Sequence, residues 1–223
     1  MNKRILLWST LIGVMLLIVY IMISLADNEP VSSVNNDAPN TISSDDIPGI
    51  LQVRGRDWTK GNPQAEVVII KYSDFQCPAC RYYAAFDDQL SKEAGEEILF
   101  VYRHFPLQSF QYSRMAAIYA EAAGRQGEFW SMHNLIYINQ HQWSGGNAES
   151  LFRQYAETLH LDMDQLDKDL QDPSIAERIQ SDYESGRELG VNSVPALFIN
   201  GDRIQNPNSQ DAYRELIESY INE

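Results

Sequence analysis

Two cysteines are the residues of this 223-residue chain whose type and spacing could do chemistry. They form the sequence Cys77-Pro78-Ala79-Cys80, and the chain has no other thiol. Thiolate is the reactive form of cysteine, and its pKa falls at a helix N-terminus, where unpaired N–H groups and the helix dipole stabilise negative charge. The spacing therefore predicts a redox-active dithiol, with Cys77 as the attacking sulfur and Cys80 shielded one helical turn further along.

Three other interpretations of the pair carry less support. A structural disulfide closing so short a loop would contribute only about 2 kcal/mol, against about 3 kcal/mol for a 15-residue loop. A zinc site normally needs four ligands. The chain has no second CxxC, and its histidines are scattered: His104, His133, His141 and His160. A pair of inert reduced thiols is not expected either, because the N-terminal sequence predicts export to an oxidising compartment, where thiols tend to form disulfides. We therefore expect no metal and no cofactor beyond the Cys77–Cys80 disulfide itself.

The segments around the pair predict the elements that position it. Residues 66–72 (EVVIIKY) follow a Gly-Asn-Pro turn and are typical of a buried strand. A helix is expected from Cys77 to about Ala94, with Pro78 in its first turn, where a missing N–H costs nothing. Residues 97–103 (EILFVYR) predict a second strand. The dithiol would then lie where a strand ends and a helix begins.

The second half of the chain changes periodicity. Apolar residues recur at helical spacing from about residue 109 to residue 190, which predicts an all-helical block. Residues 195–199 predict a third strand, and Asn200-Gly201 is a strong hairpin signal before the return strand. A last amphipathic helix is expected to close the chain. The order predicts an α/β fold with a helical insertion over residues 109–190.

The N-terminus predicts a membrane segment. Residues 5–25 carry no charge and follow Lys3 and Arg4. About 20 apolar residues span a bilayer as a helix, and basic residues stay on the cytoplasmic side. We expect residues 1–26 to be a single-pass anchor in the cell membrane, with the N-terminus cytoplasmic. The sequence SLA at residues 24–26 also fits a cleavage site, so a removable signal peptide is the alternative.

The remainder would be exported. Residues 27–50 are rich in Asn, Asp, Ser and Pro, which predicts a flexible linker, and residues 51–223 form the domain outside the membrane. The formal net charge is −14. Without Lys3 and Arg4, 15 basic residues face 31 acidic ones, a net charge of −16 on the exported part. This acidity argues against nucleic acid as a partner, because phosphate binding needs clustered basic residues.

Four landmarks together resemble a known family. The stretch KYSDFQCPAC at residues 71–80 resembles the active site of the DsbA-like thiol:disulfide oxidoreductases of the thioredoxin-like superfamily, whose usual pattern is F-S-D-F-x-C-P-x-C. Tyr72 replaces the first phenylalanine of that pattern. Residues 61–65, 102–107 and 190–201 (GNPQA, YRHFPL and GVNSVPALFING) resemble three further family segments in the same order. The likeness covers about residues 55–223, and the N-terminal segment is similar to that of membrane-tethered members.

The resemblance implies a thioredoxin-like fold and a cis peptide bond between Val194 and Pro195. The alternative is the more common trans bond, with Pro195 at the beginning of a strand. A cis bond would expose the backbone of Val194 beside Cys77, where an extended substrate could pair with it as an added strand. We therefore expect Val194, Pro195, Pro78 and Ala79 to contact substrate.

The expected function is oxidation of unfolded exported proteins that carry free cysteines, by a monomer. The resemblance implies a membrane quinone-linked thiol oxidase as the reoxidising partner. Strongly oxidising family members carry a histidine between the cysteines, and this chain has Pro-Ala instead. An exported reductase or isomerase is therefore the alternative within the class. Asp74 and Lys71 are candidates for tuning the pKa of the cysteines, and a surface position is the alternative for Asp74.

Two other functional classes remain. A binding or chaperone module would use aromatic residues as a surface, although such residues are more often core: Tyr82, Tyr83, Phe105, Phe110, Trp130 and Trp143. A glutathione-dependent transferase would have no need of Cys80. Acidic runs are expected to be solvated faces: Asp87-Asp88, Glu96-Glu97, and Asp162, Asp164, Asp167 and Asp169. They do not match the ligand pattern of a calcium-binding EF-hand.

Overall fold

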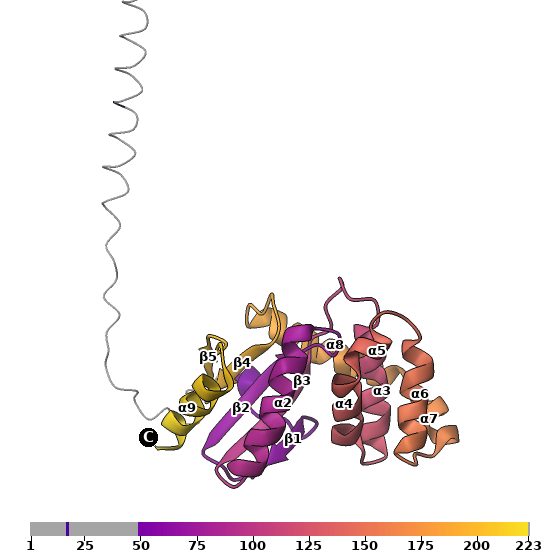
Figure 1. The fold of residues 1–223 in the computed structure, drawn as a ribbon, viewed down its shortest axis with the longest axis horizontal. Coiled ribbons are helices and arrows are strands. Elements are labelled where there is room, and N and C mark those ends of the chain that lie inside the picture. Colours follow the sequence, from indigo (N-terminus) through magenta and orange to yellow (C-terminus); the bar gives the residue numbers. More distant parts are fainter. Residues whose placement is uncertain (1–16, 18–48, 223) are drawn as a thin grey trace, which may run out of the picture. The chain divides into compact units, whose positions relative to one another are not determined.

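A five-stranded sheet forms the centre of the domain, in the order β1-β3-β2-β4-β5 (Figure 1). A computed structural model of the chain describes residue 17 and residues 49–222, so the predicted anchor apart from residue 17 and most of the predicted linker lie outside the described residues. The strands are β1 (Trp58–Gly61), β2 (Val67–Ser73), β3 (Ile98–His104), β4 (Ala196–Ile199) and β5 (Asp202–Ile204). Strands β2 and β3 are parallel, and the other neighbours pair antiparallel.

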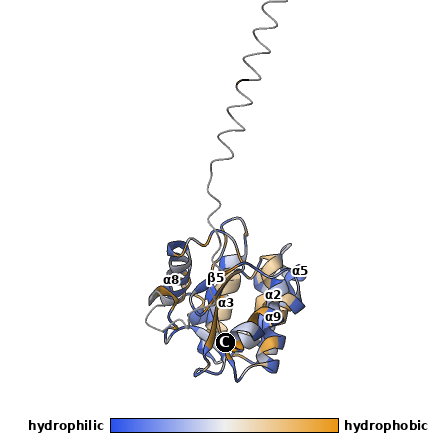
Figure 2. Ribbon diagram, turned by 90° about the vertical axis from the view of Figure 1, so that its left-hand side faces the viewer, coloured by the Kyte–Doolittle hydropathy of each residue, from blue (hydrophilic) through white to orange (hydrophobic). Residues whose placement is uncertain are grey.

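Helices cover both faces of this sheet. Their bounds are α2 (Pro78–Glu93), α3 (Ser113–Arg125), α4 (Phe129–Ile138), α5 (Gln140–Trp143), α6 (Ala148–Thr158), α7 (Met163–Asp169), α8 (Pro173–Glu188) and α9 (Gln210–Ile221), with a 3-10 turn at Gly49–Leu51. Helices α2 and α9 pack on one face, and α8 with its following loop packs on the other. In Figure 2, α9 shows hydrophilic and hydrophobic residues on one helix, as a helix that covers a sheet should.

Helices α3 to α8 all come from the chain between β3 and β4. Figure 1 shows α3 to α7 gathered beside the sheet. Small residues allow close packing there: Ala116, Ala120 and Ala123 of α3 are fully buried, and they share a core with the Phe75 side chain next to the cysteines. The helical block is therefore packed directly against the end of β2 that carries the dithiol.

Several predicted elements are confirmed with shifts of one or two residues. These are strands β2, β3 and β4, the Asn200-Gly201 hairpin, helix α2 and the closing helix α9. Strand β1 was not predicted. It has four residues, alternates between exposed and half-buried positions, and ends at Gly61 with φ 107°. An edge strand so short carries too few apolar positions to show periodicity, and its partner β3 lies about 40 residues away along the chain.

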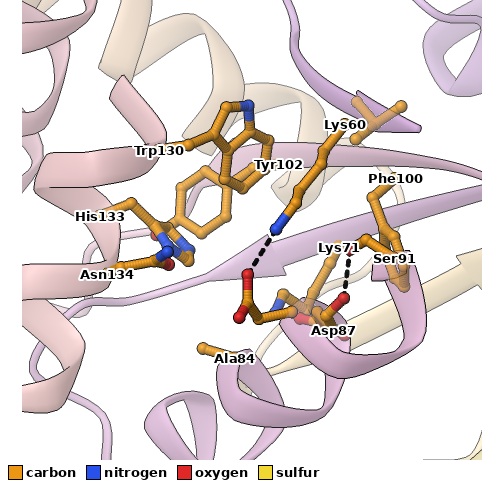
Figure 3. A pocket seen from close by; sticks show the side chains of 12 residues that line it. Lys60, Lys71, Ala84, Asp87, Ser91, Phe100, Tyr102, Trp130, His133 and Asn134 are labelled. Carbon is orange, nitrogen blue, oxygen red and sulfur yellow. Dashed lines mark hydrogen bonds and ion pairs between the residues drawn. The ribbon is translucent and has the colours of Figure 1, made fainter. Parts of the chain in front are cut away.

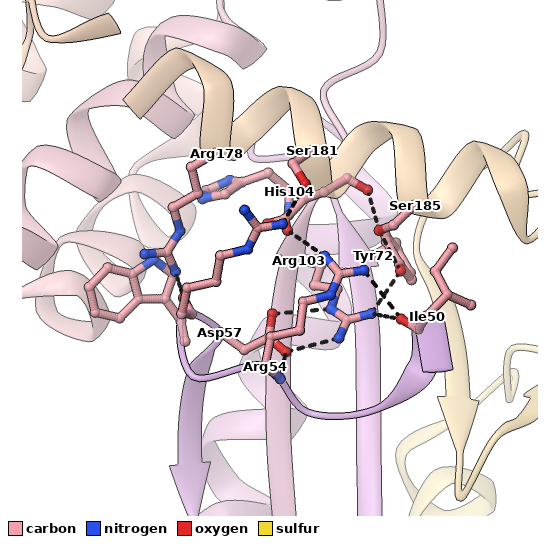
Figure 4. Close-up of polar contacts among 12 residues, drawn as sticks. Ile50, Arg54, Asp57, Tyr72, Arg103, His104, Arg178, Ser181 and Ser185 are labelled. Carbon is pink, nitrogen blue, oxygen red and sulfur yellow. Dashed lines mark hydrogen bonds and ion pairs between the residues drawn. The ribbon is translucent and has the colours of Figure 1, made fainter. Parts of the chain in front are cut away.

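The end of the predicted linker belongs to the fold. Ile50, the last residue of that predicted linker, packs against the core, and its carbonyl oxygen accepts a hydrogen bond of 2.6 Å from Arg103 Nη1. Figure 4 shows the fully buried Arg103 binding Asp57 through two of its nitrogens while Arg54 reaches toward α8. The Arg54 guanidinium lies 3.6 Å from Asp182 of that helix. These ion pairs hold residues 50–57 against the sheet and α8.

Two acidic residues do not lie on solvated faces as expected. Asp169 is buried and its Oδ1 lies 2.8 Å from Nη1 of Arg125. Asp87 is half-buried on α2 and forms an ion pair with the buried Lys71. Local sequence shows only that these positions are acidic. The basic residues that pair with Asp87 and Asp169 come from other elements of the chain. The burial of these two acidic residues was mispredicted for that reason.

Candidate active site

The dithiol lies at the junction of β2 and α2. Cys77 is the N-cap residue of α2, with φ −75° and ψ 122°, and Pro78 occupies the first helical position. Cys77 keeps 7% of its surface exposed, whereas Cys80 is completely buried. Both are free thiols in this structure. The more accessible sulfur is thus the one at the end of the helix, where an incoming thiol can reach it.

The two sulfurs have opposite acid–base character. A hydrogen bond from the Cys80 thiol, assisted by backbone N–H groups of Cys80 and Ala79, lowers the pKa of Cys77 to about 7. Burial opposes this shift, and so does the negative charge of Asp74. For Cys80, burial raises the pKa well above its ordinary 9.0. At neutral pH about half of the molecules therefore carry a negative charge on the dithiol, and that charge resides on Cys77.

The residues expected to meet substrate surround Cys77. The Val194-Pro195 peptide bond is cis, as the resemblance implied. The Cys77 thiol donates to Val194 O at 3.5 Å, although the two residues are 117 positions apart. Pro78 and Ala79 are exposed beside them, while Pro195 is buried and anchored through its carbonyl by Asn206 Nδ2 at 2.7 Å. The Cys77 sulfur and the carbonyl of Val194 thus lie in contact, next to the exposed Pro78 and Ala79.

Asp74 is buried rather than on the surface, with 1% of its area exposed. Its carboxylate accepts hydrogen bonds from Ser113 Oγ at 2.5 Å, from the Leu107 N–H at 2.7 Å and from the Gln76 N–H at 2.7 Å. Burial raises the pKa of Asp74, and these three donors oppose the rise. Its own N–H donates to Cys80 Sγ at 3.5 Å. The Cys77 N–H donates to Asp74 O at 3.2 Å, so Asp74 links both cysteines to the loop after β3.

Lys71 is also buried, on the face of β2 that α2 covers. Its ammonium group forms an ion pair with Asp87, so Lys71 and Asp74 have different partners. Burial lowers the pKa of Lys71 to about 8, and attraction to Cys80 opposes this shift. The two residues predicted to tune the cysteines therefore lie at separate positions, Asp74 in the turn before Cys77 and Lys71 on the strand that α2 covers.

The helical block supplies residues that the sequence analysis missed. Gln140, the first residue of α5, is buried and its Nε2 donates to Phe75 O at 2.7 Å and to Cys77 O at 3.0 Å. The Tyr137 hydroxyl donates to Asp74 O at 3.2 Å and contacts Ser73 Oγ at 2.9 Å. Neither residue belongs to a motif. Their role arises only because α4 and α5 fold back onto the turn that carries Cys77.

The aromatic residues considered as a binding surface mostly belong to the core. Tyr83, Phe105 and Trp143 are buried, and Phe110 and Trp130 are partly buried and pack against the core. Tyr82 is about half exposed on α2. Within residue 17 and residues 49–222, no group of three or more His, Cys, Asp or Glu is arranged to hold a metal ion. In the same described residues, no helix is long and apolar enough to span a membrane.

This site and this fold define a class. A parallel β2–β3 pair, a CxxC at the start of the following helix and a cis-proline loop facing it are the defining parts of a thioredoxin-like dithiol domain. The profile of the family described as Thioredoxin matches residues 54–219. The chain belongs to the thioredoxin family.

Solved structures share the fold. A thioredoxin-like oxidoreductase from Silicibacter pomeroyi has a TM-score of 0.65 at 24% identity, with 76% of this chain and 95% of that chain covered. Wolbachia pipientis alpha-DsbA1 has a TM-score of 0.67 at 18% identity, covering 81% and 96%. Oxidised BdbD from Bacillus subtilis has a TM-score of 0.62 at 19% identity, covering 74% and 92%. At these identities the likeness shows the fold.

Curated relatives are longer proteins. The chain is 33% identical over 157 residues to a protein named Na(+)/H(+) antiporter NhaA 1 from Mycolicibacterium gilvum, and 34% identical over 165 residues to one named NhaA 3 from Salinispora tropica. The matches cover 68% and 74% of this chain but 24% of each relative. The chain spans about a quarter of the length of these curated relatives.

Proposed function

We propose that this protein is a thiol:disulfide oxidoreductase that oxidises cysteine pairs in exported proteins. The observation that carries the proposal is the asymmetry of the dithiol. Cys77 is accessible at the start of α2 with its pKa lowered to about 7, and Cys80 is buried with a raised pKa. A low thiol pKa makes Cys77 both a ready nucleophile and a good leaving group in exchange with another protein.

The proposed reaction has two steps. A substrate thiolate attacks Cys77 Sγ of the disulfide form, the Cys77–Cys80 bond breaks, and its electron pair goes to Cys80 Sγ. A second substrate thiolate then attacks the substrate sulfur of the mixed disulfide and releases Cys77 as thiolate. The substrate has lost two electrons and gained a disulfide, and the protein holds both electrons as its reduced dithiol. The backbone of Val194 is positioned to hold an extended substrate segment during both steps.

The site favours intermediate oxidising power. Stabilisation of the Cys77 thiolate stabilises the reduced form, which makes the disulfide more oxidising. A pKa of about 7 is close to that of thioredoxin, whereas the corresponding DsbA cysteine has a value of about 3.5. We therefore propose an oxidase weaker than DsbA. The same observation favours a second candidate, an exported reductase, because thioredoxin reduces disulfides at about −270 mV.

The location and the partners are proposed from the sequence. Residues 1–26 are proposed as a membrane anchor, or alternatively a removed signal peptide, and either would export the acidic domain. The protein is proposed to be a monomer. A quinone-linked thiol oxidase in the same membrane is proposed as the acceptor of its electrons. Antiport, which the names of the curated relatives state, is not proposed, since this chain corresponds to only a quarter of their length.

The deciding experiment is a redox titration against glutathione. We expect a midpoint between −270 mV and −120 mV, the values of thioredoxin and DsbA, with the oxidised protein forming disulfides in a reduced, unfolded test protein. Cys77→Ser should abolish this activity and Cys80→Ser should trap mixed disulfides. A midpoint at or below −270 mV would establish the reductase, and full activity of Cys77→Ser would show a binding module instead.

A further inference from the structure

An open groove runs beside the active-site helix, between α2 and α4. It has a volume of about 360 Å³, which lies within the range of pockets that bind a ligand or the side chains of a partner. Helix α2 contributes Ala84 and Ala85 to its lining, and α4 contributes Tyr137 and Ile138. These side chains present methyl groups, an aromatic ring and a branched aliphatic chain. The groove therefore offers apolar contact to whatever enters it.

The groove begins one helical turn from the reactive cysteine. Arg81, which lines it, follows Cys77 by four residues, and the Arg81 N–H donates to Cys77 O at 3.2 Å. The two residues therefore lie on one face of α2, and Ala85 continues that face along the groove. On the side of α4, Ile138 stands two residues before Gln140, whose Nε2 donates to Cys77 O at 3.0 Å. A polypeptide joined to Cys77 can consequently continue into the groove.

The two ends of the groove differ in charge. Arg81 is exposed, and its guanidinium makes no ion pair or hydrogen bond with any of the described residues. At the other end, Asp88 accepts hydrogen bonds from Lys60 Nζ at 2.5 Å and from Lys92 Nζ at 2.7 Å. Figure 3 shows Lys60 reaching toward α2 from β1, in a smaller cavity that adjoins this end of the groove. The groove therefore has an unpaired positive charge near Cys77, although the net charge of the chain is −14.

An exposed aliphatic side chain stands on the rim of the same groove. Ile138 is 66% exposed, which is the largest exposed fraction among the large hydrophobic side chains that the structure describes. A single exposed hydrophobic residue on a protein surface needs no special explanation. This one, however, shares a groove with the unpaired Arg81, and the groove continues from the surface at Cys77. Covering Ile138 with an apolar group of a partner would be favourable in proportion to the area removed from water.

We propose that this groove binds the segment of a substrate polypeptide next to its reacting cysteine, with an acidic side chain on Arg81 and an aliphatic side chain on Ile138. The inference rests on the proposed function and names its class of substrate, which is proteins with acidic and aliphatic residues near the cysteine. Arg81 lies about 6 Å beyond Cys77 along the helix axis, since each helical residue advances about 1.5 Å. An extended chain advances about 3.3 Å per residue. The acidic residue is therefore expected two positions from the substrate cysteine.

The test measures how fast the reduced protein reacts with peptides of different charge. Each peptide has one cysteine, held as a mixed disulfide with thionitrobenzoate, a leucine next to it, and glutamate, glutamine or lysine two positions before or after it. The Cys77 thiolate attacks the peptide sulfur, the disulfide bond breaks, and coloured thionitrobenzoate leaves with the electron pair. In one of the two placements, we expect the glutamate peptide to react about threefold faster than the glutamine peptide and about tenfold faster than the lysine peptide.

Matched variants separate recognition from folding, because the substituted side chains are exposed. Arg81→Glu should reverse the order of the peptides, so that the lysine peptide reacts fastest. Arg187→Glu makes the same change of charge on α8, which covers the other face of the sheet, and should keep the wild-type order. Replacing the leucine of the glutamate peptide by serine should slow the wild type by about threefold, and this difference should disappear in Ile138→Ser.

A small uncharged disulfide, bis(2-hydroxyethyl) disulfide, serves as the reference for the reactivity of Cys77 itself. Each peptide rate is divided by the rate of the same variant with this reference. Equal relative rates for the three charged peptides, or an unchanged order in Arg81→Glu, would overturn the inference and leave the proposed function intact. A reversed order in Arg187→Glu would also overturn it, since the cause would be the overall charge of the protein. A leucine preference that persists in Ile138→Ser would refute the aliphatic contact. Failure of the wild type to react with any of these disulfides would instead refute the proposed function.

Discussion

Reactivity at the scale of single residues depends on how two identical side chains are made unequal. Cys77 and Cys80 are three residues apart, yet one sulfur meets helix N–H groups and the surface while the other is enclosed. In the reduced form, a thiolate on Cys77 is stabilised by the thiol of Cys80. The difference in pKa therefore comes from position along one helical turn, and it sets which sulfur reacts first.

The first prediction concerns the acidity of Cys77. Reduced protein alkylated with iodoacetamide at different pH values should show one fast thiol whose rate has a midpoint near pH 7, because the pKa of Cys77 is about 7. Mass spectrometry should place the label on Cys77 and leave Cys80 unmodified below pH 9. Cys80→Ala should raise the midpoint, since the hydrogen bond from Cys80 is the main cause of the shift.

The same shift has a consequence for stability. The folded pKa of Cys77 is below its ordinary 9.0, so its contribution to stability is complete above pH 9 and is lost as pH falls through about 7. Guanidinium unfolding of the reduced protein should therefore show a rise in stability from pH 7 to pH 8.5 that is smaller in Cys77→Ser. An equal rise in both proteins would contradict a lowered pKa at Cys77.

A second prediction concerns Asp74. Asp74→Ala removes the acceptor of three hydrogen bonds and should lower the free energy of unfolding by about 2–3 kcal/mol. It should also lower the pKa of Cys77, because the carboxylate raises it. Asp74→Asn, which removes the charge but keeps the shape, should give the same shift of the alkylation midpoint. A midpoint that rises in both variants would show that Asp74 acts on Cys77 through geometry alone.

Some of these residues were predictable and others were not. Cys77 and Cys80 were identified from spacing and helix chemistry, and Pro195 only through the family resemblance, since most prolines are trans. The burial of Asp87 was mispredicted because the lysine that pairs with it, Lys71, lies on another element. The role of Gln140 could not be predicted from the sequence. A single polar residue in a helical segment does not show which part of the fold it will contact until the helix is packed.

At the scale of elements, the site depends on the contact between the β2–α2 turn and the helical block. Helix α5 has only four residues, but it brings Gln140 onto the carbonyls of Phe75 and Cys77. Gln76 reaches back, with Oε1 accepting from the Tyr112 N–H at 2.7 Å and Nε2 donating to Ser144 O at 3.3 Å. The turn is therefore held from both sides by residues of the helical block.

The third prediction tests this support. Gln140→Leu keeps the volume but leaves Phe75 O without its donor, and should cost about 1–3 kcal/mol of stability. It should also slow exchange at Cys77, because the position of the sulfur is no longer held. Gln142→Leu on the same helix is the control, since Gln142 is exposed and bonds only to Asn139. Equal exchange rates in both variants would contradict a positioning role for Gln140.

The elements themselves were predicted unevenly. Strands β2 and β3 were visible as buried apolar runs, and the hairpin was visible from Asn200-Gly201. Within the helical block, the short helices α5 and α7 were not predicted, because four and seven residues carry too few apolar positions to show a helical period. Strand β1 depends on pairing with β3, a tertiary interaction that overrides weak local preference.

At the scale of the whole domain, a network of buried charged residues joins residues 50–57 to the rest of the fold. Arg103 of β3 is fully buried and binds Asp57 through Nε at 3.2 Å and Nη2 at 2.9 Å. It also donates to Ile50 O, to Gln52 O at 2.8 Å and to the Tyr72 hydroxyl at 3.0 Å. One guanidinium thus connects residues 50–57, β2 and β3.

The last prediction is that this network supports the fold without setting the redox chemistry. Arg103→Met leaves the Asp57 carboxylate buried without its cation and should lower the free energy of unfolding by about 3–5 kcal/mol. Arg103→Met/Asp57→Asn removes both charges and should recover part of that loss. The network lies on the face of the sheet covered by α8, whereas Cys80 belongs to α2, which covers the opposite face. The midpoint against glutathione should therefore stay unchanged in the double variant, and a large shift would show that the two faces of the sheet are coupled.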